Sequence, residues 1–206
     1  MSNRLMAMLA YLGAAWAIVR PAVDSVPGGA RTDVYNSIWS MWFAHHSAAA
    51  GHLPWATELL NAPTGGTVLL PDPLAAIFGL IAVPTLGAAG AYTALVLLRL
   101  AAAGFVAHLF AADWLEHSGL SPAQAGRAAW VAGLGVLTAP VLLAGLQCGT
   151  TEAVSGAWPV LSAWMCWRAT IHRGRQAGWL AALALIGAAI ASWYSAVIGF
   201  TLGGLL

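Results

Sequence analysis

Long apolar runs alternate with short polar segments along most of the chain. Five of these runs approach the length of about 20 residues at which an apolar helix crosses the hydrocarbon core of a bilayer. They cover residues 5–23, 91–115, 128–146, 153–170 and 177–194. The pattern predicts an all-α fold, a polytopic integral membrane helix bundle that forms a single transmembrane domain over residues 1–206.

The first run has two interpretations. It follows Arg4 in a short positive N-terminus, which favours a cytoplasmic location for that end. The triplet Ala15-Trp16-Ala17 fits the small-x-small pattern of a signal-peptide cleavage site. Because the triplet lies inside the apolar run, with Arg20 beyond it, we favour an uncleaved signal anchor in the inner (plasma) membrane.

Residues 73–90 form a sixth apolar stretch, which could span the membrane or lie in its interface. The stretch carries two prolines and three glycines. Arg168, Arg173 and Arg175 cluster in one short loop, and the positive-inside rule places that loop in the cytoplasm with Arg4. This arrangement requires that residues 73–90 do not cross. Residues 24–90 are then one long extracytoplasmic loop with juxtamembrane helices over 34–50 and 73–87.

The first of these interfacial helices has a clear helical period. Val34, Ile38, Met41 and Trp42 fall at i, i+4, i+7 and i+8, which places them on one stripe of a helix. Asp33 precedes the stripe in the N-cap position. A loop this long is uncommon unless it is functional, so the sequence points to a site at the extracytoplasmic face.

Composition supports the membrane interpretation and excludes one class of partner. The chain is 60% hydrophobic and 7% charged, whereas an average soluble domain is about 25% charged. Such a chain has too little polar surface to cover a core in water. The net charge of +1 provides no basic patch, which argues against binding of nucleic acid.

Cysteine and histidine add little. The predicted topology separates Cys148 from Cys166 by about 27 Å along the membrane normal, too far for a disulfide. His45 and His46 are adjacent and point about 100° apart on a helix, so with His52 they lack a face that presents two ligands to zinc. Residues 196–206 form a further apolar run, and a chain that stops inside such a run is expected to be a fragment of a longer protein.

Four segments carry a resemblance to a known family: RTDVYNSIWSMWFAHHSAAAGHLPW, NAPTGGTVLLPDPLAAIFGL, LLRLAAAGFVAHLFAADWL and GTTEAVSGAWPVLSAWMCWRA. They resemble the N-terminal module of GT-C-type polytopic membrane glycosyltransferases, and they are most similar to GT-C-like bacterial membrane proteins of the YfhO type. The resemblance runs over nearly all of the chain. It departs from the family in length, because GT-C enzymes usually have many more spans.

The resemblance implies roles for three residues. Asp33 matches the essential acidic residue of the first extracytoplasmic loop, and Glu152 matches an acidic residue in the next external loop. Arg99 matches an arginine near the outer end of the second span that faces the lipid phosphate.

Each of these residues also has a plain structural interpretation. Asp33 and Glu152 stand where a carboxylate caps a helix or meets its positive N-terminal dipole. Arg99 lies within a predicted span, where a guanidinium needs an anion. A lipid phosphate, Asp72 and Glu152 are the candidates.

The predicted function is transfer of a sugar from a polyprenyl-phosphate donor to an envelope glycan or lipid acceptor at the extracytoplasmic face. Asp33 and Glu152 are the candidate catalytic residues, with Asp33 as the base. Trp39 and Trp42 are candidates for stacking on the sugar ring. Arg99 and Asp72 complete the candidate substrate-binding set. A divalent metal is a candidate cofactor at Glu152, and the alternative function is a non-enzymatic transporter or glycolipid-binding protein.

Overall fold

The computed structural model describes residues 3–19, 26–29, 32–60, 63–68, 70 and 72–205. The predicted all-α class is confirmed, since the structure is 79% helical and 2% strand. The helices are α1 (Asn3–Val19), α2 (Val34–Ala49), α3 (Pro73–His117), α4 (Pro122–Leu137), α5 (Pro140–Cys148), a 3₁₀ helix η1 (Glu152–Val154), α6 (Ala157–His172), α7 (Arg175–Ala191) and α8 (Trp193–Gly204). Two short strands, β1 (Ala56–Thr57) and β2 (Gly66–Thr67), pair antiparallel.

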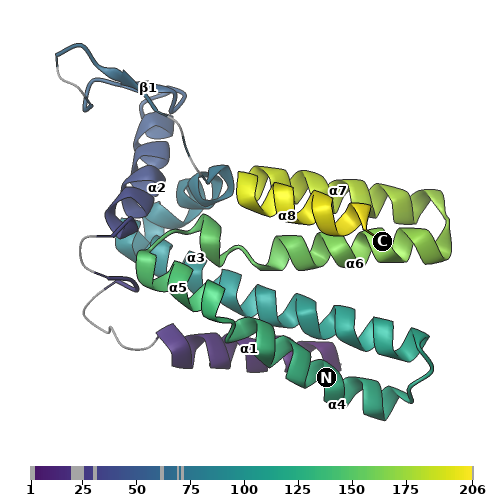
Figure 1. Cartoon of the computed structure of the whole chain (residues 1–206). Coiled ribbons are helices and arrows are strands. Elements are labelled where there is room, and N and C mark those ends of the chain that lie inside the picture. Colours follow the sequence, from purple (N-terminus) through teal and green to yellow (C-terminus); the bar gives the residue numbers. More distant parts are fainter. Residues whose placement is uncertain are drawn as a thin grey trace.

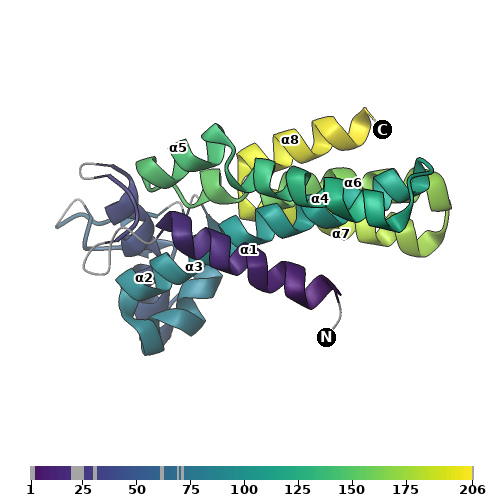
Figure 2. The ribbon, with the colours of Figure 1, turned by 90° about the horizontal axis from the view of Figure 1, so that it is seen from below.

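Most helices run along one axis as a bundle (Figure 1). The second part of α3 is central, because it packs against α1, α4 and α6, while α7 and α8 pack on α6. Helix α2 crosses the bundle at one end, and the β1–β2 hairpin projects beyond it (Figure 1). Figure 2 shows the same separation between α2 at one end and the long helices.

Helix α3 consists of two arms joined at Gly87. This residue has φ 69° and ψ 168°, which lie outside the helical region. Glycine adopts such values without a steric penalty because it has no Cβ. The arm before Gly87 lies beside α2, and the arm after it enters the bundle (Figures 1 and 2). The helix predicted over 73–87 and the apolar run from 91 therefore lie on opposite sides of this kink.

Small residues bring three helices close together in the core. Tyr11 of α1 is fully buried where α3 and α4 cross. A Cβ on Gly133 would lie 2.0 Å from the Tyr11 hydroxyl and 2.6 Å from the carbonyl oxygen of Gly104. Only glycine leaves room for this contact, which is the small-residue packing typical of membrane helices.

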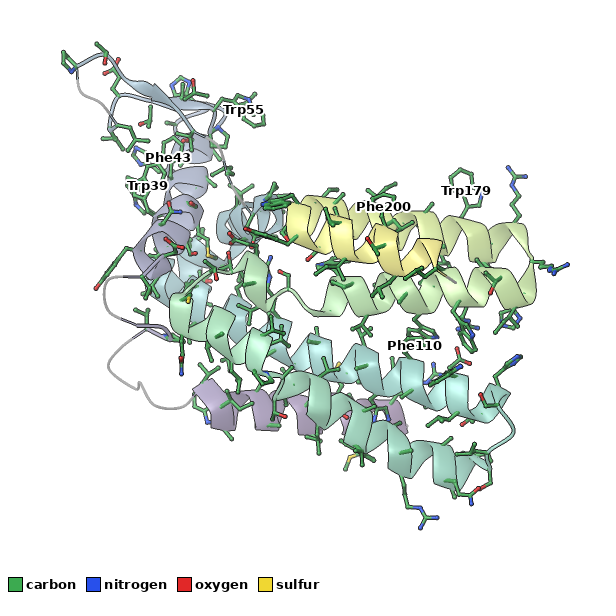
Figure 3. All side chains as sticks on the ribbon, in the orientation of Figure 1. Trp39, Phe43, Trp55, Phe110, Trp179 and Phe200 are labelled. Carbon is green, nitrogen blue, oxygen red and sulfur yellow. The ribbon has the colours of Figure 1, made fainter. Side chains whose placement is uncertain are left out.

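Two helical segments in the described part of the chain are long and apolar enough to cross a membrane. They are Pro73–His117 and Pro122–Cys148, and the apolar helices Arg4–Val19 and Arg175–Ala191 are shorter. Large apolar side chains are exposed on the outer faces of the bundle, among them Trp179 of α7 and Phe200 of α8 (Figure 3). Both observations agree with membrane association.

Three predicted runs differ from the helices that the structure forms. The run over 128–146 is divided between α4 and α5, because Ala139 leaves the helical region with ψ 132° and Pro140 starts a new helix. The run over 177–194 is divided at Ser192, where the backbone is extended with φ −173° and ψ 155°. The Ser192 side chain accepts a hydrogen bond from the Ser195 N–H and so starts a new helix. The run over 153–170 begins with η1, and α6 starts at Ala157.

The arginine-rich loops gather at one end of the bundle. Helix α1 begins, α3 ends, α6 ends and α7 begins at this end (Figure 1). Arg4, Arg168, Arg173 and Arg175 belong to these termini. The α2 end contains Asp33, Glu58, Asp72 and Glu152, while Asp113 and Glu116 lie near the end of α3 beside the arginines.

Candidate functional site

The segment that leads into α2 is fastened to the C-terminal end of α5. Three consecutive carbonyls at this end accept hydrogen bonds from it: Gln147 from Gly29 N (2.7 Å), Cys148 from Asp33 N (3.0 Å) and Gly149 from Ser37 Oγ (2.9 Å). The last carbonyls of a helix have no partner within the helix, so these bonds satisfy them. They also fix the position of Asp33 relative to α5.

Gly149 makes this attachment possible. It ends α5 in the left-handed conformation with φ 71°. A Cβ at this position would lie 2.1 Å from Cγ2 and 2.6 Å from N of Val34, the first residue of α2. The close approach and the positive φ both require glycine.

The loop after Gly149, which carries Glu152, is held by a buried ion pair. Arg99 of α3 pairs with Asp72 through its two terminal guanidinium nitrogens, and the Nη2–Oδ1 distance is 2.9 Å. The Arg99 Nη1 also donates to the Thr151 carbonyl at 2.7 Å. Asp72 in turn accepts from the Ala75 N–H at 2.9 Å and caps the first arm of α3. One arginine therefore joins the two arms of α3 to the Glu152 loop.

Asp33 and Glu152 line one cavity of about 640 Å³. The walls are mostly apolar and come from α4, α5, α6 and α8. The described lining residues are Asp33, Val136, Ala139, Val141, Leu142, Thr150, Glu152, Ala153, Ser155, Gly156, Pro159, Tyr194, Ser195 and Ile198. Two acidic residues that are distant in sequence thus line the same mostly apolar cavity.

The Asp33 carboxylate is not used for capping. Asp33 occupies the N-cap position of α2, yet its side chain forms no capping hydrogen bond. Asp33 is exposed and Glu152 is half-buried, and neither carboxylate bonds to another described residue. Both acids therefore keep their oxygens available to a ligand in the cavity.

Three helices begin beside this cavity, whose described lining contains no arginine or histidine. Asp33 stands at the start of α2, Gly156 is the N-cap of α6, and Ser195 lies in the first turn of α8. The free N–H groups and dipole at a helix N-terminus favour an anion. The N-caps of α2 and α6 form no side-chain capping bond.

Arg99 and Asp72 occupy positions different from those expected of substrate contacts. Their side chains are 9% and 4% exposed, and each is the other's partner. The sequence left a lipid phosphate, Asp72 and Glu152 as candidate partners of Arg99, and in the structure Arg99 forms an ion pair with Asp72. Neither residue is among those that line the Asp33–Glu152 cavity.

Trp39 and Trp42 are also not brought to the cavity. Trp39 stacks on Phe43 with a ring-centroid distance of 4.8 Å, and Trp42 stacks on His46 at 4.8 Å. Figure 3 shows Trp39 and Phe43 on the side of α2 that faces away from the bundle. Trp39 and Trp42 are therefore close to Asp33 in sequence but do not line the cavity that Asp33 lines.

The described residues contain no group of three or more histidine, cysteine, aspartate or glutamate side chains able to hold a metal ion. Asp33 and Glu152 alone are fewer protein ligands than the metal sites of enzymes usually have. The donor set of the described residues therefore does not fit a resident metal.

Sequence reasoning missed the residues that α8 contributes. Tyr194, Ser195 and Ile198 line the cavity because α8 folds back beside α6. The signal that could have located this turn is Ser192, because serine is a common N-cap residue and its side chain can accept a hydrogen bond from the N–H three residues later.

No family model matches the chain, and searches of curated proteins and of solved structures find no significant match.

Proposed function

We propose that this chain is a GT-C-type membrane glycosyltransferase that transfers a sugar from a polyprenyl-phosphate donor at the extracytoplasmic face. One observation carries the proposal. Asp33 and Glu152, which are 119 residues apart in sequence, line a single apolar-walled cavity with their carboxylates unbonded to described residues.

The proposed setting is a polytopic bundle in the plasma membrane with a cytoplasmic N-terminus. Exposed apolar side chains on α1, α3, α7 and α8 support it, since lipid is the solvent that suits them. The arginine-rich end is assigned to the cytoplasm by the positive-inside rule. Helix α2 and the first arm of α3 then lie in the outer interface, and the cavity opens there.

The cavity suits the three chemical parts of such a donor. Its apolar walls from α4, α5 and α8 accept isoprenoid groups. The N-termini of α2 and α6, which form no side-chain capping bond, provide N–H groups and dipoles for the phosphate. The two carboxylates accept hydrogen bonds from sugar and acceptor hydroxyls.

In the proposed step, an acceptor hydroxyl oxygen attacks the anomeric carbon of the donor. The new carbon–oxygen bond forms as the bond to phosphate breaks, and polyprenyl phosphate leaves with the bonding electrons. Asp33 takes the hydroxyl proton as general base, while Glu152 contacts the acceptor. Arg99 acts at a distance as a positioning residue, because it holds the carbonyl of Thr151 beside Glu152.

Asp33→Asn tests the proposal. The protein is reconstituted in vesicles with polyprenyl-phosphate glucose or mannose carrying a radiolabelled sugar, and with a cell-envelope acceptor fraction. We expect transfer to fall roughly 10²- to 10⁴-fold, the usual contribution of a general base. Thermal stability should not change, since the Asp33 side chain forms no capping bond.

Glu58→Gln is the matched control, because it removes one carboxylate near the hairpin and away from the cavity. Transfer by this variant should equal that of the wild type. Full transfer by Asp33→Asn shows that Asp33 is not the base. Donor binding with no transfer by the wild type identifies a glycolipid-binding protein on the same scaffold.

A further inference from the structure

A second cavity lies at the arginine-rich end of the bundle, between α1, α3, α4 and α6. Its volume is about 400 Å³. Among the described residues, four charged side chains line it: Arg4, Asp113, Glu116 and Arg168. The remaining lining comes from His108, Leu109, Ala112, Pro122, Gly126 and Trp164. The cavity is separate from the Asp33–Glu152 site, since the two share no lining residue.

The charged groups are only partly used within the protein. Asp113 Oδ2 accepts a hydrogen bond from Trp164 Nε1 at 2.7 Å and lies 3.6 Å from Arg168 Nε. The Arg168 guanidinium lies 5.9 Å from the centre of the Trp164 ring. Asp113 Oδ1, the terminal nitrogens of Arg168 and the Glu116 carboxylate form no bond with the described residues. The cavity therefore presents donors and acceptors of both signs to whatever fills it.

We propose that this cavity binds the headgroup of a zwitterionic aminophospholipid, which carries a phosphate and a primary ammonium. Two guanidinium groups and two carboxylates balance to no net charge. A purely anionic ligand would be repelled by Asp113 and Glu116, and a purely cationic ligand would be repelled by Arg4 and Arg168. Only a ligand with both charges pairs with all four side chains.

The position of the charges sets the orientation of the headgroup. The phosphate pairs with Arg4 and Arg168, since guanidinium groups bind phosphate oxygens through paired N–H bonds. The primary ammonium donates to Asp113 and Glu116. A trimethylammonium group has no N–H to donate, so choline lipids lose these bonds.

The acyl chains have an apolar path next to Arg4. Leu5, Met8 and Leu9 are exposed on α1 at this end. This inference rests on the membrane embedding proposed above but not on sugar transfer. Resistance of the membrane fraction to alkaline extraction reports embedding, so failure of that premise is measured separately.

Native mass spectrometry of the full chain tests the proposal. The detergent-solubilised protein is titrated with dioleoyl phosphatidylethanolamine, phosphatidylcholine and phosphatidylglycerol, which share acyl chains and differ only in headgroup. We expect phosphatidylethanolamine to bind about tenfold more tightly than either of the others, as loss of one or two charge-assisted hydrogen bonds implies. Equal affinities for the three lipids overturn the proposal.

Substitutions of opposite charge give opposite results for the anionic lipid. Glu116→Gln should weaken binding of phosphatidylethanolamine and strengthen binding of phosphatidylglycerol, because one ammonium partner and one repulsive carboxylate are removed together. Arg168→Met should weaken both. Arg4→Met should do the same, and this exposed residue near the chain start can be replaced without disturbing the bundle. Unchanged selectivity in folded Glu116→Gln and Arg4→Met proteins overturns the proposal.

Two further measurements complete the design. Arg173→Met is the matched control, since Arg173 is an exposed arginine at the same end that does not line the cavity. It should bind all three lipids as the wild type does. Glycerophosphoethanolamine has the headgroup without acyl chains. If it binds as tightly as the lipid, the ligand is a soluble phosphoamine and the lipid assignment is wrong.

Discussion

Replacing Arg99 with methionine should lower the free energy of unfolding by about 3–5 kcal/mol. The substitution leaves the Asp72 carboxylate without its partner in a place where its side chain is only 4% exposed. Leaving one buried charge without its partner destabilises a protein strongly, whereas replacing a whole buried ion pair by apolar side chains often changes stability little. The side chain of methionine fills much of the same volume, so loss of charge rather than loss of packing dominates the effect.

The double variant Arg99→Met/Asp72→Asn isolates this cause. Asparagine removes the charge and can still accept the hydrogen bond from the Ala75 N–H, so the cap of α3 survives. The Thr151 carbonyl loses Arg99 but still accepts from Ser155 Oγ and Val154 N, both at 3.2 Å. The loss that remains is about 1.5–3 kcal/mol, the value of one hydrogen bond to a charged group.

Unfolding in mixed micelles by added sodium dodecyl sulfate, followed by tryptophan fluorescence, measures these free energies. Arg127→Met is the control, because Arg127 is exposed on α4 and its side chain forms one hydrogen bond with the described residues, from Nε to the Ala123 carbonyl at 3.3 Å. It should change stability by less than about 0.5 kcal/mol. If the double variant is as unstable as Arg99→Met, an uncompensated Asp72 charge is not the cause, and the argument fails.

Two other predictions concern the attachment of α2 and the topology. Gly149→Ala should destabilise the protein by about 2–4 kcal/mol, from the left-handed backbone and the overlap with Val34, as measured in the same micelle titration. Gly135→Ala, with nothing within 4 Å of its Cβ, should be neutral or slightly stabilising. In a cysteine-free background, single cysteines at Gly119 and Gly174 should both be labelled from the cytoplasm. External labelling at either position contradicts the proposed orientation.

Local patterns in the sequence were sufficient to predict most helices. The apolar stripe from Val34 and the aspartate before it place α2 within one residue of its observed end at Ala49. The prolines and glycines of residues 73–90 indicated a separate helix, and Gly87 kinks α3 within this stretch. Such features depend on residues a few positions apart, so they can be read without the tertiary fold.

Contacts between distant segments were harder to predict. The sequence offered Arg99 a phosphate, Glu152 or Asp72, and the structure pairs it with Asp72 because the kink at Gly87 folds one arm of α3 back toward the other. The position of α8 depends on one extended residue, Ser192, which separates it from α7. The apolar runs over 177–194 and 196–206 placed this break after residue 194, because hydropathy averages over neighbouring residues.

The two carboxylates of the proposed site are held by backbone contacts rather than through their own oxygens. Asp33 is fixed because its N–H and the neighbouring Ser37 hydroxyl bond to the end of α5. Glu152 lies three residues after Gly149, the C-cap of α5, and the carbonyl of the preceding residue, Thr151, accepts a hydrogen bond from Arg99. Both acids are therefore positioned from one helix terminus while their carboxylates stay unbonded to the described residues. A general base needs this combination of fixed position and free oxygens, because a carboxylate already engaged in a salt bridge must first break that bond to take a proton.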